Sequence, residues 1–179
     1  MKPTLTTERL LLRPVRSEDA LHLVDLDRAP EVRRFVDQPE APTLEQCRTV
    51  VERMLGIDAS TPALGFWIAE ERSQFVGWFH LKPPREGEPA EAGDLELGYR
   101  LLQRGWGRGL ATEGSRELIR YAFETLGAPR VTAVALEGNV ASMRVMEKLG
   151  MRPWLRWEYR ARGGGKVPAV TSAITRECR

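Results

Sequence analysis

Hydrophobic positions along the chain fall into short apolar runs and longer stretches in which apolar residues recur every three or four positions. The short runs predict β-strands, and the recurring stretches predict amphipathic helices. Two of the runs, Phe66–Ala69 and Phe75–Phe79, flank a polar turn, which indicates an antiparallel hairpin. In chain order the predicted strands cover residues 9–14, 66–69, 75–79, 95–102, 131–136, 154–159 and 170–174.

Four helices are predicted between these strands. Ser17 begins the first, and Thr43 begins the second because Gln46, three residues later, completes a capping box. A third follows a glycine-rich loop past the middle of the chain, and Asn139 or Ser142 begins the fourth. Since the chain shows no internal repeat, the pattern predicts one α/β (α+β) domain over residues 1–179.

The composition narrows the class of protein. With 179 residues, 42% hydrophobic and 29% charged, the chain matches a globular domain and excludes disordered and collagen-like proteins. A net charge of +2 gives no reason to expect direct nucleic-acid binding, and no run of about 18 apolar residues predicts a membrane-spanning helix. Cys47 and Cys178 form no zinc-type cluster, so we expect no metal and a reducing, cytoplasmic location.

The segment Arg104-Gly105-Trp106-Gly107-Arg108-Gly109 places three glycines at alternate positions between a predicted strand and a predicted helix. Glycines there allow backbone N–H groups to turn toward one point at the positive end of the helix, where phosphate binds. The other interpretation is a tight turn in which the glycines serve only the backbone geometry. Three glycines exceed what a turn needs, so we favour a phosphate site.

Two known phosphate motifs do not match this loop. A nucleotide-hydrolysing P-loop needs Lys-Ser or Lys-Thr after its last glycine, whereas Leu110-Ala111 follows Gly109. A dinucleotide-binding loop follows the first strand and has a further glycine where this chain has Thr112. A nucleotide-binding protein is therefore disfavoured.

The same loop resembles the acyl-CoA loop of the GNAT N-acetyltransferases, whose pattern is Gln/Arg-x-x-Gly-x-Gly/Ala. Arg104-x-x-Gly107-x-Gly109 has this pattern. Further blocks are similar to the branch of that family that holds the ribosomal-protein N-terminal alanine/serine acetyltransferases. They occur in the family's order as Thr7–Arg13, Glu96–Tyr99, Trp106–Glu113, Asn139-x-x-Ser142 and Glu147–Gly150.

The resemblance implies a mixed, strongly twisted sheet of six to seven strands, flanked by about four helices, whose fourth and fifth strands splay apart around CoA. It also implies acetyl-CoA as the cosubstrate. Asn139 would contact the pantetheine arm, although a helix cap explains this residue equally well on local grounds. The residues whose backbone N–H groups would hold the pyrophosphate are Arg104, Gly105, Trp106, Gly107, Arg108, Gly109, Leu110, Ala111 and Thr112.

Acetyl transfer needs a neutral amine, so a base must take a proton from an acceptor whose pKa is about 8 to 10. The family often has a carboxylate at the position of Glu96, which makes Glu96 the candidate base; a solvated strand carboxylate is the alternative. Many relatives offer a tyrosine to the leaving thiolate where this chain has Met146. Ser142 and Tyr99 are then the candidate donors, with helix capping and core packing as their structural alternatives.

We therefore expect an acetyl-CoA-dependent N-acetyltransferase that acts on a primary amine in a ternary complex, as a monomer or homodimer. The acceptor is a protein N-terminus, with a ribosomal protein as one candidate, or a small cationic amine, because the window 86–96 carries five carboxylates and no basic residue. The alternative in another class is a non-catalytic acyl-CoA-binding or regulatory domain that keeps the loop. His22 and His80 have no recognisable partner in the sequence and are interpreted as structural or exposed.

Overall fold

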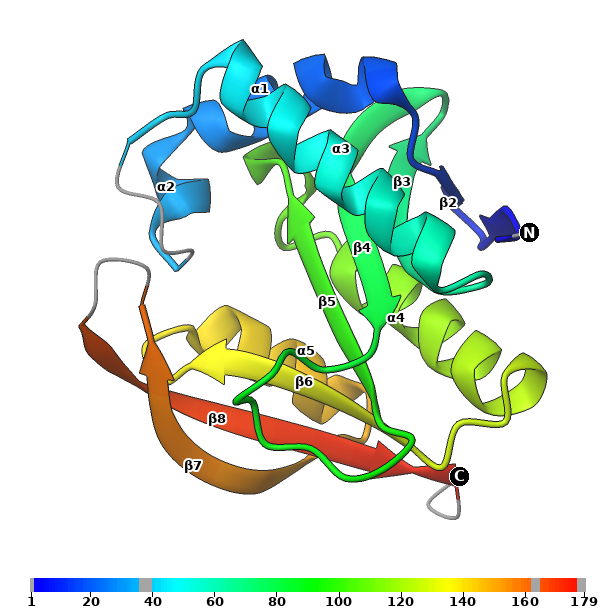
Figure 1. Cartoon of the computed structure of the whole chain (residues 1–179), viewed down its shortest axis with the longest axis vertical. Coiled ribbons are helices and arrows are strands. Elements are labelled where there is room, and N and C mark those ends of the chain that lie inside the picture. The colour runs from blue at the N-terminus through cyan, green and yellow to red at the C-terminus, as the bar shows by residue number, and fades with distance from the viewer. Residues whose placement is uncertain (1, 36–39, 162–164, 177–179) are drawn as a thin grey trace.

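The computed structural model describes residues 2–35, 40–161 and 165–176, which form one mixed sheet covered by helices (Figure 1). The described strands run across the sheet in the order β1-β2-β3-β4-β5-β6-β8-β7. They are β1 (Leu5–Thr6), β2 (Leu10–Pro14), β3 (Gly65–Glu71), β4 (Gln74–Lys82), β5 (Leu95–Leu101), β6 (Arg130–Leu136), β7 (Arg152–Arg160) and β8 (Lys166–Thr175). The α-helices are α1 (Ala20–Arg28), α2 (Pro30–Arg33), α3 (Leu44–Ser60), α4 (Leu110–Arg120) and α5 (Val140–Lys148).

The predicted mixed α/β fold is confirmed, with small differences in the number of elements. The sheet has eight described strands rather than six or seven, because the two-residue strand β1 pairs with β2. The single-turn helix α2 is a fifth described α-helix, where about four were predicted. Both extra elements are too short to produce a hydrophobic period, so the sequence pattern does not reveal them.

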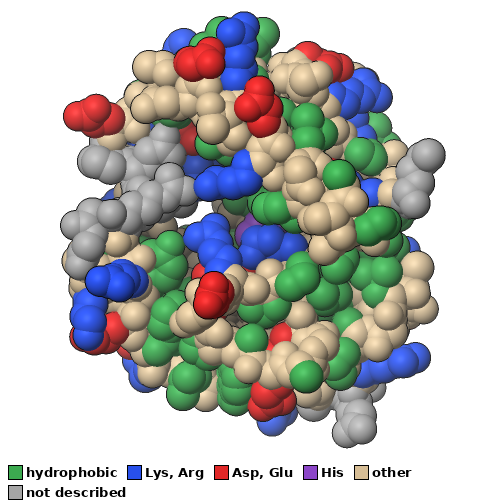
Figure 2. All heavy atoms as spheres, viewed as in Figure 1, with side chains coloured by type: hydrophobic (Ala, Val, Ile, Leu, Met, Phe, Trp, Pro, Cys, Tyr) green, Lys and Arg blue, Asp and Glu red, His purple; other side chains and the backbone are tan. Residues whose placement is uncertain are grey.

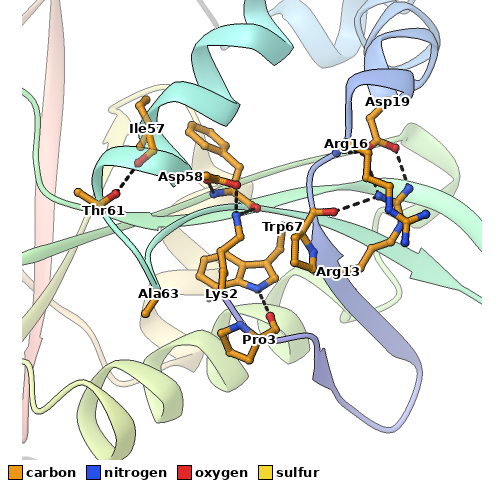
Figure 3. Close-up of polar contacts among 12 residues, drawn as sticks. Lys2, Pro3, Arg13, Arg16, Asp19, Ile57, Asp58, Thr61, Ala63 and Trp67 are labelled. Carbon is orange, nitrogen blue, oxygen red and sulfur yellow. Dashed lines mark hydrogen bonds and ion pairs between the residues drawn. The ribbon is translucent and has the colours of Figure 1, made fainter.

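The first residues of the chain are anchored to β3 and α3 (Figure 3). The indole of Trp67 donates a hydrogen bond to the Pro3 carbonyl at 2.9 Å, and the Lys2 ammonium binds the Asp58 carboxylate. Nearby, the backbone N–H of Arg16 donates to Asp19 at 2.7 Å. The prediction that Ser17 caps the first helix is therefore wrong, because Asp19 binds the backbone of Arg16, three residues earlier, and a short 3-10 turn that contains Ser17 precedes α1.

The alternating side chains of β3 pack into two apolar clusters on opposite faces of the sheet. Phe66 and Ile68 belong to a cluster with α1 and α3, whereas Trp67 and Ala69 belong to a larger cluster that includes residues of α4. Successive strand residues point to opposite faces, so this run must be apolar throughout. The sheet is thus buried on both faces at its centre. Cys47 lies in the cluster with α1 and α3, and Cys178 lies outside the described residues.

The parallel strands β5 and β6 pair only at their first residues. Leu95 lies opposite Val131 and Glu96 opposite Thr132, and no further residues of these two strands are paired. Figure 1 shows the two strands starting side by side near the C-terminus and then diverging into a V. The expected splay is present, and it falls between the fifth and sixth strands because β1 adds one to the count.

Candidate functional site

A cavity of about 1040 Å³ lies where β5 and β6 diverge. Its wall is formed by both strands, by the loop that follows β5, by α5, by α2 and by the loop after β4. The molecule is hollowed at this place, and Lys and Arg side chains surround the opening (Figure 2). The V in the sheet therefore gives one continuous space that touches both the glycine-rich loop and the residues around Glu96.

The side chains of the glycine-rich loop fix its position by hydrogen bonds to neighbouring strands. The Arg104 guanidinium donates to the Phe75 carbonyl, and the Trp106 indole donates to the Leu101 carbonyl at 2.9 Å. Arg108 makes two bonds to the Glu71 carboxylate, at 2.8 and 2.7 Å. The loop is thus fixed by its side chains, and its backbone is left to face the cavity.

The predicted phosphate-binding residues divide into those that line the cavity and those that do not. Arg104, Arg108 and the fully buried Leu110 are not in its wall. The backbone N–H groups of Gly105 and Trp106 are used inside the turn, where they donate to Leu102 and Gln103 at 2.8 and 3.0 Å. The remaining predicted residues that line the cavity are Gly107, Gly109, Ala111, Thr112 and Asn139.

Gly107 and Gly109 give the loop its backbone shape. Their φ angles are +69° and +81°, a left-handed conformation that costs a residue with a side chain about 1–2 kcal/mol. Gly109 is the N-cap of α4, so the helix begins with N–H groups that have no partner within the helix. A side-chain carbon at Gly107 would meet no atom within 4 Å, which leaves open space above this backbone for a ligand.

Glu113 is a residue whose role the sequence does not reveal. Its carboxylate accepts hydrogen bonds from the Thr7 hydroxyl at 2.6 Å and from the Arg9 backbone and side chain at 2.8 and 2.7 Å. Arg9 also donates to the Arg108 carbonyl at 2.9 Å. The block Thr7–Arg13 and the block Trp106–Glu113 are about a hundred residues apart, yet together they brace the loop and the start of α4.

The start of α5 faces the cavity from the other side. The Asn139 side-chain oxygen accepts a bond from the Ser142 backbone N–H at 3.1 Å, so Asn139 is the helix cap. Burial raises the pKa of Tyr99, and the nearby Ser142 side chain partly opposes the rise. Met146 is buried in the wall, one helical turn after Ser142. Two hydroxyl groups therefore meet next to the position where many GNAT enzymes have their tyrosine.

Glu96 is buried and has two partners on the neighbouring strand β4. The Lys82 ammonium binds Oε2 of Glu96, and Nε2 of His80 lies 3.5 Å from Oε1. Burial opposes ionisation of Glu96, but the adjacent His80 and Lys82 outweigh it and lower the pKa of the carboxyl to about 2. The candidate base is therefore an ion-paired carboxylate with little tendency to take up a proton at neutral pH.

The sequence shows no partner for His80, but the structure gives it one. This residue is buried in the cavity wall, and its neighbour Glu96 is a titratable partner that the sequence pattern did not indicate. Burial lowers the pKa of His80, an effect that Glu96 opposes. The signal is absent from the sequence because the two residues meet only through the register of β4 against β5.

Most carboxylates of the acidic window are occupied by cations. Arg130 binds Asp94 at 2.6 Å and Glu91 at 3.1 Å, and neither carboxylate lines the cavity. Glu88 does line it, and burial, followed by the nearby Glu96 charge, raises the pKa of its carboxyl. The window therefore offers the cavity much less negative charge than its composition indicates.

No group of three or more His, Cys, Asp or Glu side chains in residues 2–35, 40–161 and 165–176 is arranged to hold a metal ion. Within the same ranges, no helix is both long enough and apolar enough to cross a membrane.

Comparison with known proteins gives consistent matches along the chain. A family model described as an acetyltransferase (GNAT) domain matches residues 9–152. The FsC-acetyl coenzyme A-N(2)-transacetylase of Aspergillus fumigatus is 35% identical over 153 residues, which are 84% of this chain. The chain spans 65% of the length of that fungal protein. The p20 protein of Bacillus licheniformis, named as an uncharacterized N-acetyltransferase, is 29% identical over 83% of this chain and 82% of its own length.

Solved structures share the same arrangement of elements. A crystal structure titled as a putative acetyltransferase of T. thermophilus superposes with a TM-score of 0.82 at 27% identity, covering 99% of this chain and 91% of the other. A ribosomal-protein alpha-N acetyltransferase titled RimL, in complex with coenzyme A, superposes with a TM-score of 0.78 at 17% identity, covering 99% and 98%. The latter similarity shows the fold alone.

Proposed function

Because this chain belongs to the GNAT acetyltransferase family, whose members take their acetyl group from acetyl-CoA, we propose that it transfers that group to a primary amine by direct attack. The single observation that carries this proposal is the cavity at the V between β5 and β6, which is continuous from the glycine-rich loop to the residues around Glu96. Two substrates that enter from opposite sides can meet in such a space. Direct transfer requires that meeting.

The glycine-rich loop is the proposed site for the pyrophosphate of CoA. The N–H groups that remain for it run from Gly107 to Thr112, at the positive end of α4. From there the pantetheine arm passes into the V. The edge of β5 beyond Glu96 has no strand partner on the β6 side, so its backbone groups can bind the arm and polarise the thioester carbonyl.

Tyr99 and Ser142 are the proposed source of the proton for the leaving sulfur. The Ser142 side chain is near enough to Tyr99 to lower its pKa, and both residues line the cavity. Met146 supplies no proton at the neighbouring position. A donor on β5 therefore replaces the tyrosine that many relatives carry on the helix.

The cations around the cavity bear on the class of acceptor. The cavity wall carries more cations than carboxylates: Arg33, Arg34, Arg85, Arg100, Arg144 and Lys148 against Glu31, Glu88 and Glu96. A polycationic acceptor would be repelled there, whereas an amine that also carries a carboxylate would be attracted. We therefore favour a small amine that bears an anionic group over a polyamine. The N(2) in the name of the fungal relative is compatible with a small-molecule acceptor, and the RimL likeness gives no support to a ribosomal one.

An acceptor screen tests this function. The protein is incubated with acetyl-CoA and, separately, an amino acid, a peptide with a free N-terminus and a polyamine. Release of the CoA thiol and the mass of each acceptor are then measured. Acetylation of the carboxylate-bearing amines, with the polyamine as the poorest substrate, is the expected result. Binding of acetyl-CoA without acetylation of any amine would instead identify a non-catalytic acyl-CoA-binding domain.

A further inference from the structure

His80 is a buried side chain with one ring nitrogen that the fold leaves without a partner. Its side chain is 8% exposed; Nε2 lies 3.5 Å from Oε1 of Glu96, whereas Nδ1 has no hydrogen-bond partner in the part of the chain that the structure describes. Buried polar atoms without partners are rare in folded proteins, and each requires an explanation. The ring is part of the cavity wall, and its nitrogens are themselves covered, so a substrate in the cavity reaches Nδ1 once the wall moves slightly.

The neighbouring strand is shaped to accommodate this imidazole. His80 lies directly opposite Gly98 in the pairing of β4 with β5. A side-chain carbon at Gly98 would lie 2.6 Å from Cε1 and 2.7 Å from Nε2 of His80, well inside normal contact distance. Only glycine at position 98 leaves the ring its place over β5, the strand that borders the proposed thioester site.

Aromatic contacts fix the orientation of the same ring. Trp78 stacks on His80 with ring centroids 5.7 Å apart and planes 19° apart, and Phe66 meets it edge-on at 5.3 Å. The His80 ring is thus held by packing on several sides and by Glu96 at Nε2, which leaves Nδ1 free of any bond. A group held in this way is preorganised for proton transfer, since it need not break a bond of its own first.

The charged groups around His80 favour a neutral imidazole that becomes protonated when a proton is offered. Glu96 on β5 faces Nε2, whereas Lys82 on β4 and Arg85 in the following loop oppose a positive charge on the ring. Burial lowers the pKa of His80 below its ordinary value near 6.5, so the ring is neutral at pH 7. Glu96 remains ionised beside Lys82 and stabilises the imidazolium once it forms.

We propose that His80, and not Glu96, is the catalytic base that accepts the proton of the attacking amine, and that Glu96 is a positioning residue that holds the ring through Nε2. This inference rests on the proposed acetyl transfer. A small movement of the cavity wall uncovers Nδ1 of His80; the amine nitrogen then forms its bond to the acetyl carbon and passes one proton to Nδ1. The carbon–sulfur bond breaks, its electron pair leaves with the sulfur, and the thiolate takes a proton from the Tyr99–Ser142 pair. The imidazolium returns its proton to that pair through solvent before the next turnover.

The test compares His80→Phe, which keeps the aromatic packing, with His80→Gln, which keeps a polar group. Each variant is first checked for folding by thermal unfolding and for acetyl-CoA affinity by calorimetry, and we expect both properties close to wild type. With the best acceptor of the screen, we expect kcat to fall by about 100-fold or more in both variants, the usual contribution of a general base. A loss confined to KM would show that His80 only shapes the pocket, and would overturn the proposal.

The pH dependence of kcat separates His80 from Glu96. In the wild type, kcat should fall as the pH decreases through the His80 pKa, below about 6.5, because the imidazolium cannot accept a proton. This acidic limb should be absent in His80→Gln. In Glu96→Gln it should move to still lower pH, because the charge that supports the imidazolium is gone, with a smaller loss of kcat. Full activity in His80→Phe together with inactivity in Glu96→Gln would assign the base to Glu96. If the wild type acetylates no amine at all, the proposed function fails instead.

Discussion

The substitution Gly98→Ala places a methyl group on β5 directly against the His80 ring. Its carbon would lie 2.6, 2.7 and 3.3 Å from three ring atoms, whereas carbon atoms in contact stay about 3.5–4.0 Å apart. The ring must therefore move by about 1 Å or the strand must shift. A displacement of about 1 Å in a reacting group costs about 100-fold in rate, and overpacking costs about 1–3 kcal/mol of stability.

The assay measures kcat, acetyl-CoA affinity and the free energy of unfolding in urea. Gly56→Ala is the matched control, because a side-chain carbon at this helical position meets nothing within 4 Å and is expected to stabilise α3 by about 0.5–1 kcal/mol. For Gly98→Ala we expect kcat to fall by about 100-fold while acetyl-CoA still binds.

A double-mutant cycle shows whether the effect acts through His80. In a His80→Ala background the ring is absent, so the methyl group at position 98 has space and should cost little further stability or activity. Activity of Gly98→Ala within twofold of wild type would refute the reasoning. So would a loss of the same size in both backgrounds, because it would place the effect in the β5 backbone.

Two further predictions concern the loop and the ion pairs of the acidic window. Gly107→Ala and Gly127→Ala both place a side chain at a left-handed φ with open space around it, so each should lose about 1–2 kcal/mol of stability. Only Gly107→Ala should also weaken acetyl-CoA binding in calorimetry, and equal affinities would show that the loop is no more than a turn. Asp94→Asn breaks the buried pair with Arg130 and should lower the free energy of unfolding by about 3 kcal/mol, whereas the exposed Glu86→Gln should change it by less than about 0.5 kcal/mol. Burial opposes ionisation of Asp94, but Arg130 outweighs this effect and lowers the pKa of the carboxyl. The stabilisation by this pair is therefore present above the ordinary carboxyl pKa near 4 and should be lost as the pH falls. A free energy of unfolding that does not decrease at low pH would contradict the assignment.

The parts of the fold that could be predicted depend on neighbouring residues in the chain. Thr43 and Gln46 form the predicted capping box, and the β3–β4 hairpin turns where its polar residues indicated. Asn139 caps α5, and Gly150 ends it with a φ of +79°. Such signals lie within a few positions of one another, so local sequence contains them. By contrast, β1 forms only because β2 lies beside it, and a two-residue strand has no pattern of its own.

The candidate site likewise has a part that the sequence predicts and a part that it does not. The glycine-rich loop is contiguous, so its position between a strand and a helix follows from the sequence. The surroundings of Glu96 do not, because Lys82 and His80 reach it only through the register that places Lys82 opposite Glu96 and His80 opposite Gly98. An isolated glutamate on a predicted strand looks like a base. The same glutamate beside a lysine and a histidine is better suited to orient and stabilise the residue that takes the proton.

The central claim is that acetyl-CoA and the amine occupy the cavity together and react directly. Initial rates measured at several concentrations of both substrates test it most directly. We predict double-reciprocal lines that intersect, and an intact mass of the protein unchanged after incubation with acetyl-CoA alone. Parallel lines, together with an acetylated protein in the absence of amine, would mean that the group passes through an enzyme nucleophile, and this would contradict the account.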